Sequence, residues 1–296
     1  MTRRLLGVLI GAAVVGCREA GSDRPATPAV IAPAPRPTAF RIPPDSEIPA
    51  DQVGASIRRG RAILAAPKDS LPRYVGSDLR CTSCHLDFGT RADASPWIGV
   101  YSRFPQYRSR NAKINVIEDR INDCFQRSLN GKALEWGGRD MADIIAYMAF
   151  LSRGVAPPGE VPGQGFPRMT PLDPDTAAGR RVYLSQCVRC HGADGQGLPN
   201  PDSTALPRVY PPVWGPRTFT IGAGMARLRT AASFIRHNMP FDRPGTLTDQ
   251  QAFDVAGYML SHSRPDFGPK ALDWPQGDPP PDVAYPTNAA KPTRPR

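Results

Sequence analysis

Apolar residues recur at intervals of three and four in several segments, which is the spacing of an amphipathic helix. The clearest case is residues 142–151, where Ile144, Tyr147, Met148 and Leu151 fall on one face. Residues 142–148 (ADIIAYM) also parallel residues 253–259 (FDVAGYM). The chain therefore contains two copies of a helical unit.

The upstream segments repeat as well. Residues 59–64 (RGRAIL) parallel residues 178–184 (AGRRVYL). The stretch from Gly60 to Cys81 is longer than the stretch from Gly179 to Cys187, so the first copy carries an insertion. Both copies predict a helix at the start and a helix at the end of an all-α unit.

A further helix is predicted around Cys124. Its buried stripe consists of Ile114, Ile117, Ile121, Phe125 and Leu129, spaced three and four apart. Arg120 precedes Cys124 by four residues and Ser128 follows it by four, so these three side chains are expected on one face.

Prolines and the amino terminus set the expected boundaries. Residues 1–16 have a basic start and an apolar run typical of a secretion signal, and the residues before Cys17 resemble a bacterial lipoprotein signal. The alternative is an ordinary cleaved signal with an incidental cysteine. No 18-residue apolar run follows position 16, which excludes a polytopic membrane protein. We therefore expect a periplasmic protein, anchored to a membrane through lipidated Cys17.

Proline-rich stretches separate the expected compact units, and they predict extended, flexible chain rather than packed structure. The expected organisation is a tether at 17–49, a first domain at 50–155, a linker at 156–173, a second domain at 174–266 and a flexible tail at 267–296.

The formal net charge of the 296-residue chain is +10. No basic helix interleaved with aromatic residues is present, so the charge does not indicate a nucleic-acid partner. A small anionic substrate or an acidic protein partner fits an exported protein better.

The cysteines carry the most specific chemistry. Residues 81–85 (CTSCH) and 187–191 (CVRCH) both match C-x-x-C-H, the attachment motif of haem c. Two thiols add to one porphyrin, and the adjacent imidazole reaches the iron. A redox dithiol or a zinc site is the alternative, and two copies in an exported chain disfavour both. The sequence predicts two covalently bound haem c groups, held by Cys81, Cys84, His85, Cys187, Cys190 and His191, in two tandem domains that resemble class I cytochrome c.

Each iron needs a second axial ligand. In the second domain the preferred candidate is Met239, which precedes Pro240, and the competitors are Met225 and His237. The first domain has no methionine or histidine between His85 and Met141. Cys124 is therefore the preferred ligand there. The alternatives are a lysine (Lys113 or Lys132) or an open iron with Cys124 as a small buried residue.

Arginines are dense around Cys124. Arg103, Arg108 and Arg110 precede its helix, and Arg120 and Arg127 lie within it. A guanidinium near a thiol stabilises the thiolate and also binds oxyanions. The alternative is that these arginines contact haem propionates or solvent.

Residues 120–132 (RINDCFQRSLNGK) resemble the R-I-N-x-C-F-x-R-S-x-N-G segment of the periplasmic dihaem thiosulfate dehydrogenases of the TsdA family. The resemblance extends over 50–266. It implies that Cys124 is the distal ligand of a catalytic first haem and that Arg110, Arg120 and Ser128 line its pocket. It also implies a second haem, ligated by Met239, that passes electrons to a soluble or membrane-bound cytochrome acceptor. Some members switch between lysine and methionine, but no lysine lies between Cys190 and Phe267.

The implied reaction joins two thiosulfate ions into tetrathionate. Three alternatives stay open at this point: the same site working mainly as a tetrathionate reductase, a cysteine-ligated cytochrome subunit of the Sox complex, and a plain electron-transfer cytochrome. The second haem motif within the same chain favours the self-sufficient enzyme.

Overall fold

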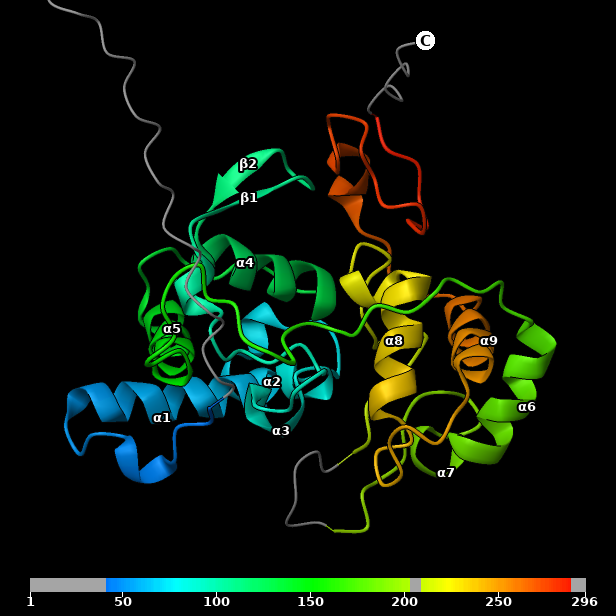
Figure 1. Ribbon diagram of the computed structural model, residues 1–296, viewed down its shortest axis with the longest axis horizontal. Coiled ribbons are helices and arrows are strands. Elements are labelled where there is room, and N and C mark those ends of the chain that lie inside the picture. Colours follow the sequence, from blue (N-terminus) through cyan, green and yellow to red (C-terminus); the bar gives the residue numbers. More distant parts are fainter. Residues whose placement is uncertain (1–40, 203–208, 289–296) are drawn as a thin grey trace, which may run out of the picture. The chain divides into compact units, whose positions relative to one another are not determined.

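The computed structural model describes residues 41–202 and 209–288 (Figure 1). The signal sequence, Cys17 and most of the proline-rich tether lie outside the described residues. Within these ranges the protein is helical apart from one two-stranded antiparallel sheet, β1 and β2. No helix in the described ranges is both long and apolar enough to cross a membrane.

The first domain contains two long helices, several short ones and the small sheet. Its α-helices and strands are α1 (Gln52–Ala65), α2 (Pro67–Ser70), α3 (Leu86–Gly89), β1 (Gln106–Arg108), β2 (Lys113–Asn115), α4 (Ile117–Asp123) and α5 (Arg139–Leu151). Its short 3-10 helices are η1 (Asp45–Glu47), η2 (Pro72–Tyr74), η3 (Cys81–Ser83) and η4 (Tyr101–Arg103). A π-helical turn, η5 (Cys124–Ser128), follows α4.

The second domain is built from four α-helices, followed by a proline-rich segment that ends the described chain. The elements are α6 (Thr176–Gln186), α7 (Val188–His191), η6 (Gly224–Ala226), α8 (Leu228–Asn238), α9 (Asp249–Leu260) and η7 (Gly268–Leu272).

The first and last helices of each domain cross at a glycine. In the first domain α1 packs on α5, and a Cβ added to Gly60 would lie 1.9 Å from the Asp143 carbonyl oxygen (Figure 1). In the second domain α6 packs on α9, and a Cβ on Gly179 would lie 2.0 Å from the Asp254 carbonyl oxygen. Only glycine allows backbones to approach this closely. The repeat in the sequence is therefore a repeat of the same helix crossing.

Each crossing also fixes a buried aspartate. Asp143 accepts hydrogen bonds from Ser56 and Arg59 of α1, and Arg59 also pairs with Asp140. Asp254 accepts from the backbone N–H of Asp175, which is the N-cap of α6. Asp143 and Asp254 thus link the last helix of each domain to the first helix of the same domain by hydrogen bonds.

The insertion in the first domain packs against the Cys124 region. It forms α2 and η2, and the N–H groups of Gly76 and Ser77 both donate to the Leu129 carbonyl. Lys132 N–H donates to the Tyr74 carbonyl. The insertion therefore holds the end of the turn that carries Cys124.

The helix predicted around Cys124 differs from expectation at both ends. Ile117, Ile121, Phe125 and Leu129 are buried, as the apolar spacing indicates. Ile114 is not part of this stripe, because it lies in β2, opposite Tyr107 of β1, and is 66% exposed. After Asp123 the helix widens into η5, where Leu129 N–H donates to the Cys124 carbonyl.

Three stretches that were predicted to be extended are packed. Residues 44–49 belong to the first domain, since Arg61 pairs with Asp45 and Ile48 contacts the core. The linker is bound in place, since Gly163 and Gly165 accept hydrogen bonds from the N–H groups of Asp93 and Ser95. The prediction of a flexible tail is wrong for residues 267–288, where Asp273 and Trp274 are buried. Proline content indicated flexible chain, but proline also fits extended chain packed on a surface.

The two domains contact each other directly. Leu86 and Ala94, which follow the first haem motif, are buried within the apolar cluster of the second domain. Asp78 N–H donates to the Arg217 carbonyl, and Thr220 N–H donates to the Arg127 carbonyl. These contacts bring the second domain beside the turn that carries Cys124.

Candidate active site at the first haem motif

The histidines of both C-x-x-C-H motifs are oriented by backbone carbonyls. His85 Nδ1 lies 2.6 Å from the Ser95 carbonyl oxygen, and His191 Nδ1 lies 2.9 Å from the Pro211 carbonyl oxygen. A carbonyl only accepts, so each Nδ1 carries the proton and Nε2 keeps its lone pair for a metal. Burial lowers the pKa of both imidazoles, that of His85 to about 4. A neutral ring of fixed orientation is what an iron ligand requires.

In the described chain none of the four motif cysteines is paired in a disulfide, which leaves their sulfurs available for the attachment of haem c. Burial raises the pKa of Cys84 and of Cys187 to about 12. The donor set of each motif, two partly buried thiols and one neutral imidazole, thus fits a covalently bound haem c. Its carbonyl partners, Ser95 and Pro211, have no signature in the sequence, because any residue supplies a carbonyl.

Cys124 lies beside the first motif. The charge of its thiolate is the second-largest cause, after burial, of the raised pKa values of Cys81 and Cys84. Arg120 Nη1 donates to Cys124 Sγ at 2.9 Å, and the same guanidinium contributes to the lowered pKa of His85. Cys124, Arg120 and the haem-binding residues therefore surround one space.

Arg120 is the cation most closely coupled to this sulfur. Its pKa is raised, and the largest cause is the charge of Cys124. The i,i+4 spacing on α4 brings the two side chains together, as the sequence predicts. The hydrogen bond places a cation directly beside the sulfur, which is the nucleophilic and metal-binding atom of cysteine.

The arginines that precede α4 divide between two places. Arg108 faces the Cys124 region. Burial and the nearby charge of Arg120 lower its pKa, and the charges of Asp123 and Cys124 offset part of this shift. Arg103 contributes to the same field. Arg110 instead donates from Nη1 to the Gly222 carbonyl at 2.8 Å, and its guanidinium stacks 4.8 Å from the Trp274 ring. The charge of Cys124 thus acts on Arg108, one of the three arginines that the sequence analysis named before the helix.

Arg127, in contrast to Arg108 and Arg110, binds a carboxylate. It makes two hydrogen bonds to the Asp273 carboxylate, at 2.8 and 2.7 Å, and its guanidinium lies 4.2 Å from the Phe267 ring. Asp123 is a further acidic partner. Ser128 ends the π-helical turn and is partly exposed. Within the described chain, Arg120 is the residue of this segment that hydrogen-bonds to the Cys124 sulfur.

The candidates for the second distal ligand lie in η6 (Met225), in α8 (His237) and directly after α8 (Met239). Met239 and Met225 are both partly buried against the apolar cluster of the second domain. His237 Nδ1 lies 2.9 Å from the Ser233 carbonyl oxygen, an i,i+4 contact along α8. Met239 immediately follows α8, and Asn238 beside it donates to the Asp93 carbonyl of the first domain.

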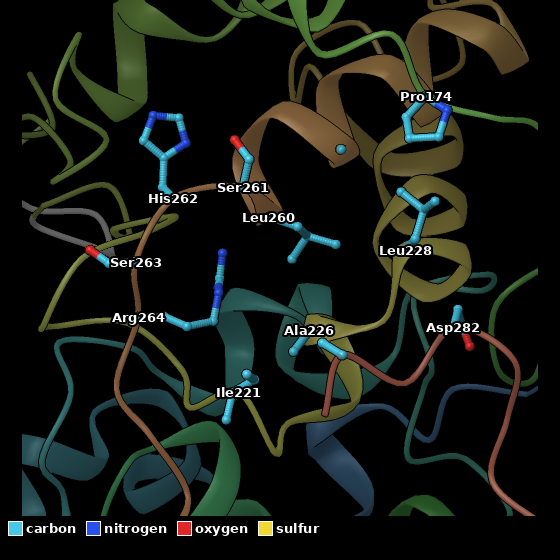
Figure 2. A pocket seen from close by; sticks show the side chains of 12 residues that line it. Pro174, Ile221, Ala226, Leu228, Leu260, Ser261, His262, Ser263, Arg264 and Asp282 are labelled. Carbon is cyan, nitrogen blue, oxygen red and sulfur yellow. The ribbon is translucent and has the colours of Figure 1, made fainter. Parts of the chain in front are cut away.

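A separate cavity of about 510 Å³ lies in the second domain (Figure 2). Its wall includes Leu228 of α8, Leu260 of α9, and Asp282. Arg264 also lines it, and burial lowers the pKa of this guanidinium to about 10. None of the haem-binding or candidate catalytic residues lines this cavity, so we do not place the chemistry there.

Comparisons with known proteins agree with this organisation. A family model described as the SoxA/TsdA cytochrome c domain matches residues 76–156, and one described as cytochrome C oxidase, cbb3-type, subunit III matches residues 174–259. The two matches confirm the predicted tandem of cytochrome c domains, and with both attachment motifs they establish two covalently bound haem c groups.

Curated relatives match most of the chain. It is 45% identical over 253 residues to the thiosulfate dehydrogenase of Psychrobacter arcticus, covering 84% of this chain and 75% of that protein. It is 44% identical over 238 residues to the thiosulfate dehydrogenase of Allochromatium vinosum, covering 79% and 87%. Among solved structures, thiosulfate dehydrogenase (TsdBA) from Marichromatium purpuratum superposes with a TM-score of 0.71 at 36% identity, over 77% of this chain and 50% of that one. The chain belongs to the thiosulfate dehydrogenase family of dihaem cytochromes c.

Proposed function

We propose that the protein oxidises two thiosulfate ions to tetrathionate at Cys124 and passes the electrons to a cytochrome acceptor. The observation that carries the proposal is the 2.9 Å hydrogen bond from Arg120 to Cys124 Sγ, next to the first haem attachment motif. The contact supports the proposal because it joins a cysteine sulfur to a cation near His85, which would hold the first iron. Family membership supports the substrate, since the relatives are named for thiosulfate.

The site must first gather two dianions that repel each other. Arg120 and Arg108 supply positive charge beside Cys124, and the net charge of the chain favours the approach of anions. A guanidinium binds the sulfonate end of thiosulfate through two parallel hydrogen bonds. Such binding leaves the outer sulfane sulfur free to reach Cys124.

The chemistry then divides into two steps at one sulfur. In the first, the Cys124 thiolate and the sulfane sulfur of one thiosulfate form a sulfur–sulfur bond, and two electrons are lost. In the second, the sulfane sulfur of another thiosulfate attacks the bound sulfane sulfur, which forms tetrathionate and releases Cys124 as a thiolate. Tetrathionate carries one negative charge on each sulfonate end, the third negative charge leaves on the Cys124 thiolate, and no proton is transferred.

The cofactors supply the electron sink. When bound, the two haems each accept one electron at a time, which matches the two electrons lost per tetrathionate formed. His85 and Cys124 would hold the first iron, and His191 and Met239 the second. In the second domain, a thioether ligand raises the reduction potential and favours onward transfer.

The decisive experiment uses the purified holoprotein alone with thiosulfate and a soluble one-electron acceptor such as ferricyanide. We expect acceptor reduction and tetrathionate as the product, in a ratio of two electrons per tetrathionate. Activity that appears only when a partner cytochrome and a carrier protein are added would contradict the proposal and favour a Sox-type subunit. Comparing this rate with tetrathionate-dependent oxidation of a reduced viologen gives the preferred direction.

We also propose that the protein works in the periplasm, attached through a lipid on Cys17. The support is the basic and apolar sequence of residues 1–16 followed by cysteine. Cell fractionation tests it: the native chain should be found with membranes, and a Cys17→Ala variant should be found in the soluble periplasmic fraction. A native chain in the soluble fraction would contradict the anchor but not the export.

A further inference from the structure

Two buried guanidinium nitrogens of the second domain lack hydrogen-bond partners. In the described ranges, Arg227 Nε and Arg264 Nη1 are the buried side-chain nitrogen or oxygen atoms for which no partner is present. A buried donor without an acceptor costs free energy, and most such donors in folded proteins are satisfied. Two such guanidiniums in one domain therefore indicate a ligand that accepts their hydrogen bonds.

The Arg264 guanidinium is held in place without being neutralised. Its Nη2 donates to the Met259 carbonyl at 2.9 Å, and its guanidinium carbon lies 4.5 Å from the centre of the Phe219 ring. Neither partner carries a charge. Burial lowers the pKa of Arg264 to about 10, so the group remains protonated at neutral pH. A buried cation of this kind is stabilised by an anionic partner.

Two carboxylates of the same region have other partners. Asp282 lines the same cavity as Arg264, but it accepts a hydrogen bond from the backbone N–H of Arg229. Asp266 pairs with Lys270. An anion that binds Arg264 is therefore expected to come from outside these side chains.

Arg264 is connected to the segment that orients the second motif histidine. The Pro211 carbonyl oxygen lies 2.9 Å from His191 Nδ1. Further along the same segment, Gly215 N–H donates at 2.8 Å to the carbonyl of Ser263, which directly precedes Arg264. These contacts link Arg264 to the proximal side of the second haem site.

Arg227 is connected to the distal side of the same site. It is the N-cap residue of α8, the helix that ends directly before Met239. It also directly follows η6, which contains Met225. Both methionines are candidates for the distal ligand, so Arg227 adjoins the segment of either one.

The cavity of about 510 Å³ gives room for an anion beside both arginine segments (Figure 2). Arg264 lines it, and so do Ala226 and Leu228, the two neighbours of Arg227. The propionates of a haem c leave the porphyrin at the edge opposite the thioether bonds, so residues that hold them are expected away from the motif cysteines. Neither cysteine of the second motif lines the cavity.

We propose that Arg227 and Arg264 hold the two propionate carboxylates of the second haem. A haem c carries two such carboxylates, which matches the two guanidiniums with unpartnered nitrogens in the described chain. A guanidinium binds a carboxylate through strong, charge-assisted hydrogen bonds. The positive charges also stabilise the reduced iron and so raise its reduction potential. The inference requires the second haem, but it does not require the proposed oxidation of thiosulfate.

The first test is a redox titration of both haems in holoprotein variants at Arg264. Arg264→Leu removes the charge, whereas Arg264→Lys keeps it. We expect Arg264→Leu to lower the potential of the second haem, because an unpaired propionate favours the ferric state, and Arg264→Lys to stay close to the native value. The first haem should titrate as before. Arg229→Leu removes the same charge from an exposed residue of α8 and is the matched control, for which a much smaller shift is expected.

Three outcomes would overturn the assignment of Arg264. The first is an unchanged potential of the second haem in Arg264→Leu. The second is an equal shift in Arg264→Leu and Arg264→Lys, which would show a packing role. The third is a shift confined to the first haem, which would assign the arginine to the other cofactor.

Arg227 keeps the inference falsifiable if Arg264→Leu does not fold. Arg227→Leu should lower the potential of the second haem, and Arg227→Lys should restore most of it. Native potentials in both Arg227 variants would overturn the inference for this residue.

These titrations contain no thiosulfate, so they separate this inference from the proposed function. If the native holoprotein does not oxidise thiosulfate, the proposed function fails and the potentials still decide the roles of Arg227 and Arg264. If the potentials do not move, the inference fails while the oxidation of thiosulfate is unaffected.

Discussion

The two cytochrome domains share a framework and differ in what faces the iron. Both cross their first and last helices at a glycine, and both orient a motif histidine through a backbone carbonyl. Beside the first motif lie Cys124 and Arg120, whereas the second domain offers methionine as the candidate ligand. The comparison teaches that helix packing is conserved between the copies while the distal side is free to diverge, because it lies on connecting segments.

The two domains also differ in the charged side chains that lie near their haem motifs. The surroundings of Cys124 include buried or partly buried guanidiniums that alter one another's pKa values. The pKa of His191, by contrast, is lowered by burial and partly restored by the hydrogen bond to the Pro211 carbonyl, with no arginine involved. A site for dianions needs the former arrangement, and an electron relay needs only the latter.

The largest effect is expected from removing the sulfur that distinguishes the first domain. Cys124→Gly should lower thiosulfate oxidation by at least about 10³-fold, since loss of a nucleophile disables both bond-forming steps. Both haems should stay attached, because the motif cysteines are unchanged; haem content measured after denaturation is the control. Turnover near the native rate would show that thiosulfate oxidation does not depend on Cys124, the residue that distinguishes the first domain.

The shared framework is tested by its glycines. Gly60→Ala and Gly179→Ala should each destabilise the protein by about 3 kcal/mol, since the new methyl group would meet a backbone carbonyl. Gly268→Ala is the matched control, since a Cβ there meets no atom within 4 Å. Denaturant unfolding of the holoprotein measures the effect. A large loss at one crossing and none at the other would show that the two frameworks are not equivalent.

Arg120 tests the charge difference between the domains. Arg120→Leu should lower kcat/KM for thiosulfate by about 10²-fold, as for removal of one preorganised donor, and Arg120→Lys should lie between that variant and the native protein. Arg139→Leu, at a side chain that is 84% exposed, is the control. If Arg120→Leu and Arg139→Leu behave alike, the hydrogen bond to Cys124 has no role in the reaction.

The smallest expected effect concerns the second domain. Met239→Leu should lower the reduction potential of the second haem by about 0.1 V, within the range that axial ligands span. The first haem should titrate as before. Met225→Leu is the matched control, since both methionines are partly buried against the same cluster. A redox titration in which Met225→Leu shifts the potential and Met239→Leu does not would reverse the assignment.

Local patterns predicted the parts of this molecule that depend on neighbouring residues. The helix repeats, the haem motifs and the pairing of Arg120 with Cys124 all follow from spacings of a few residues, since one helical turn brings such positions together. The same logic failed at Ile114, because β2 pairs with β1 and takes this residue out of the helix. Spacing alone does not show where a helix begins.

The proline-rich segments show the opposite limit. Their composition predicted flexible chain, and for 267–288 that prediction is wrong because Asp273 and Trp274 find buried partners on the first domain. Composition gives the average hydrophobicity of a segment, but it does not show which few side chains become buried and anchor the segment.

The sequence by itself determined that this protein carries two haem c groups on two related helical domains, because covalent attachment and helix periodicity are short-range properties of the chain. Only the tertiary structure decided which partners two of the arginines have: the Trp274 ring for Arg110, and the Asp273 carboxylate for Arg127. These pairs join residues far apart in the chain, and their contact depends on how both domains and the last segment pack together. Long-range packing has no local signature, so the arrangement of guanidiniums around Cys124 could be read only from the folded molecule.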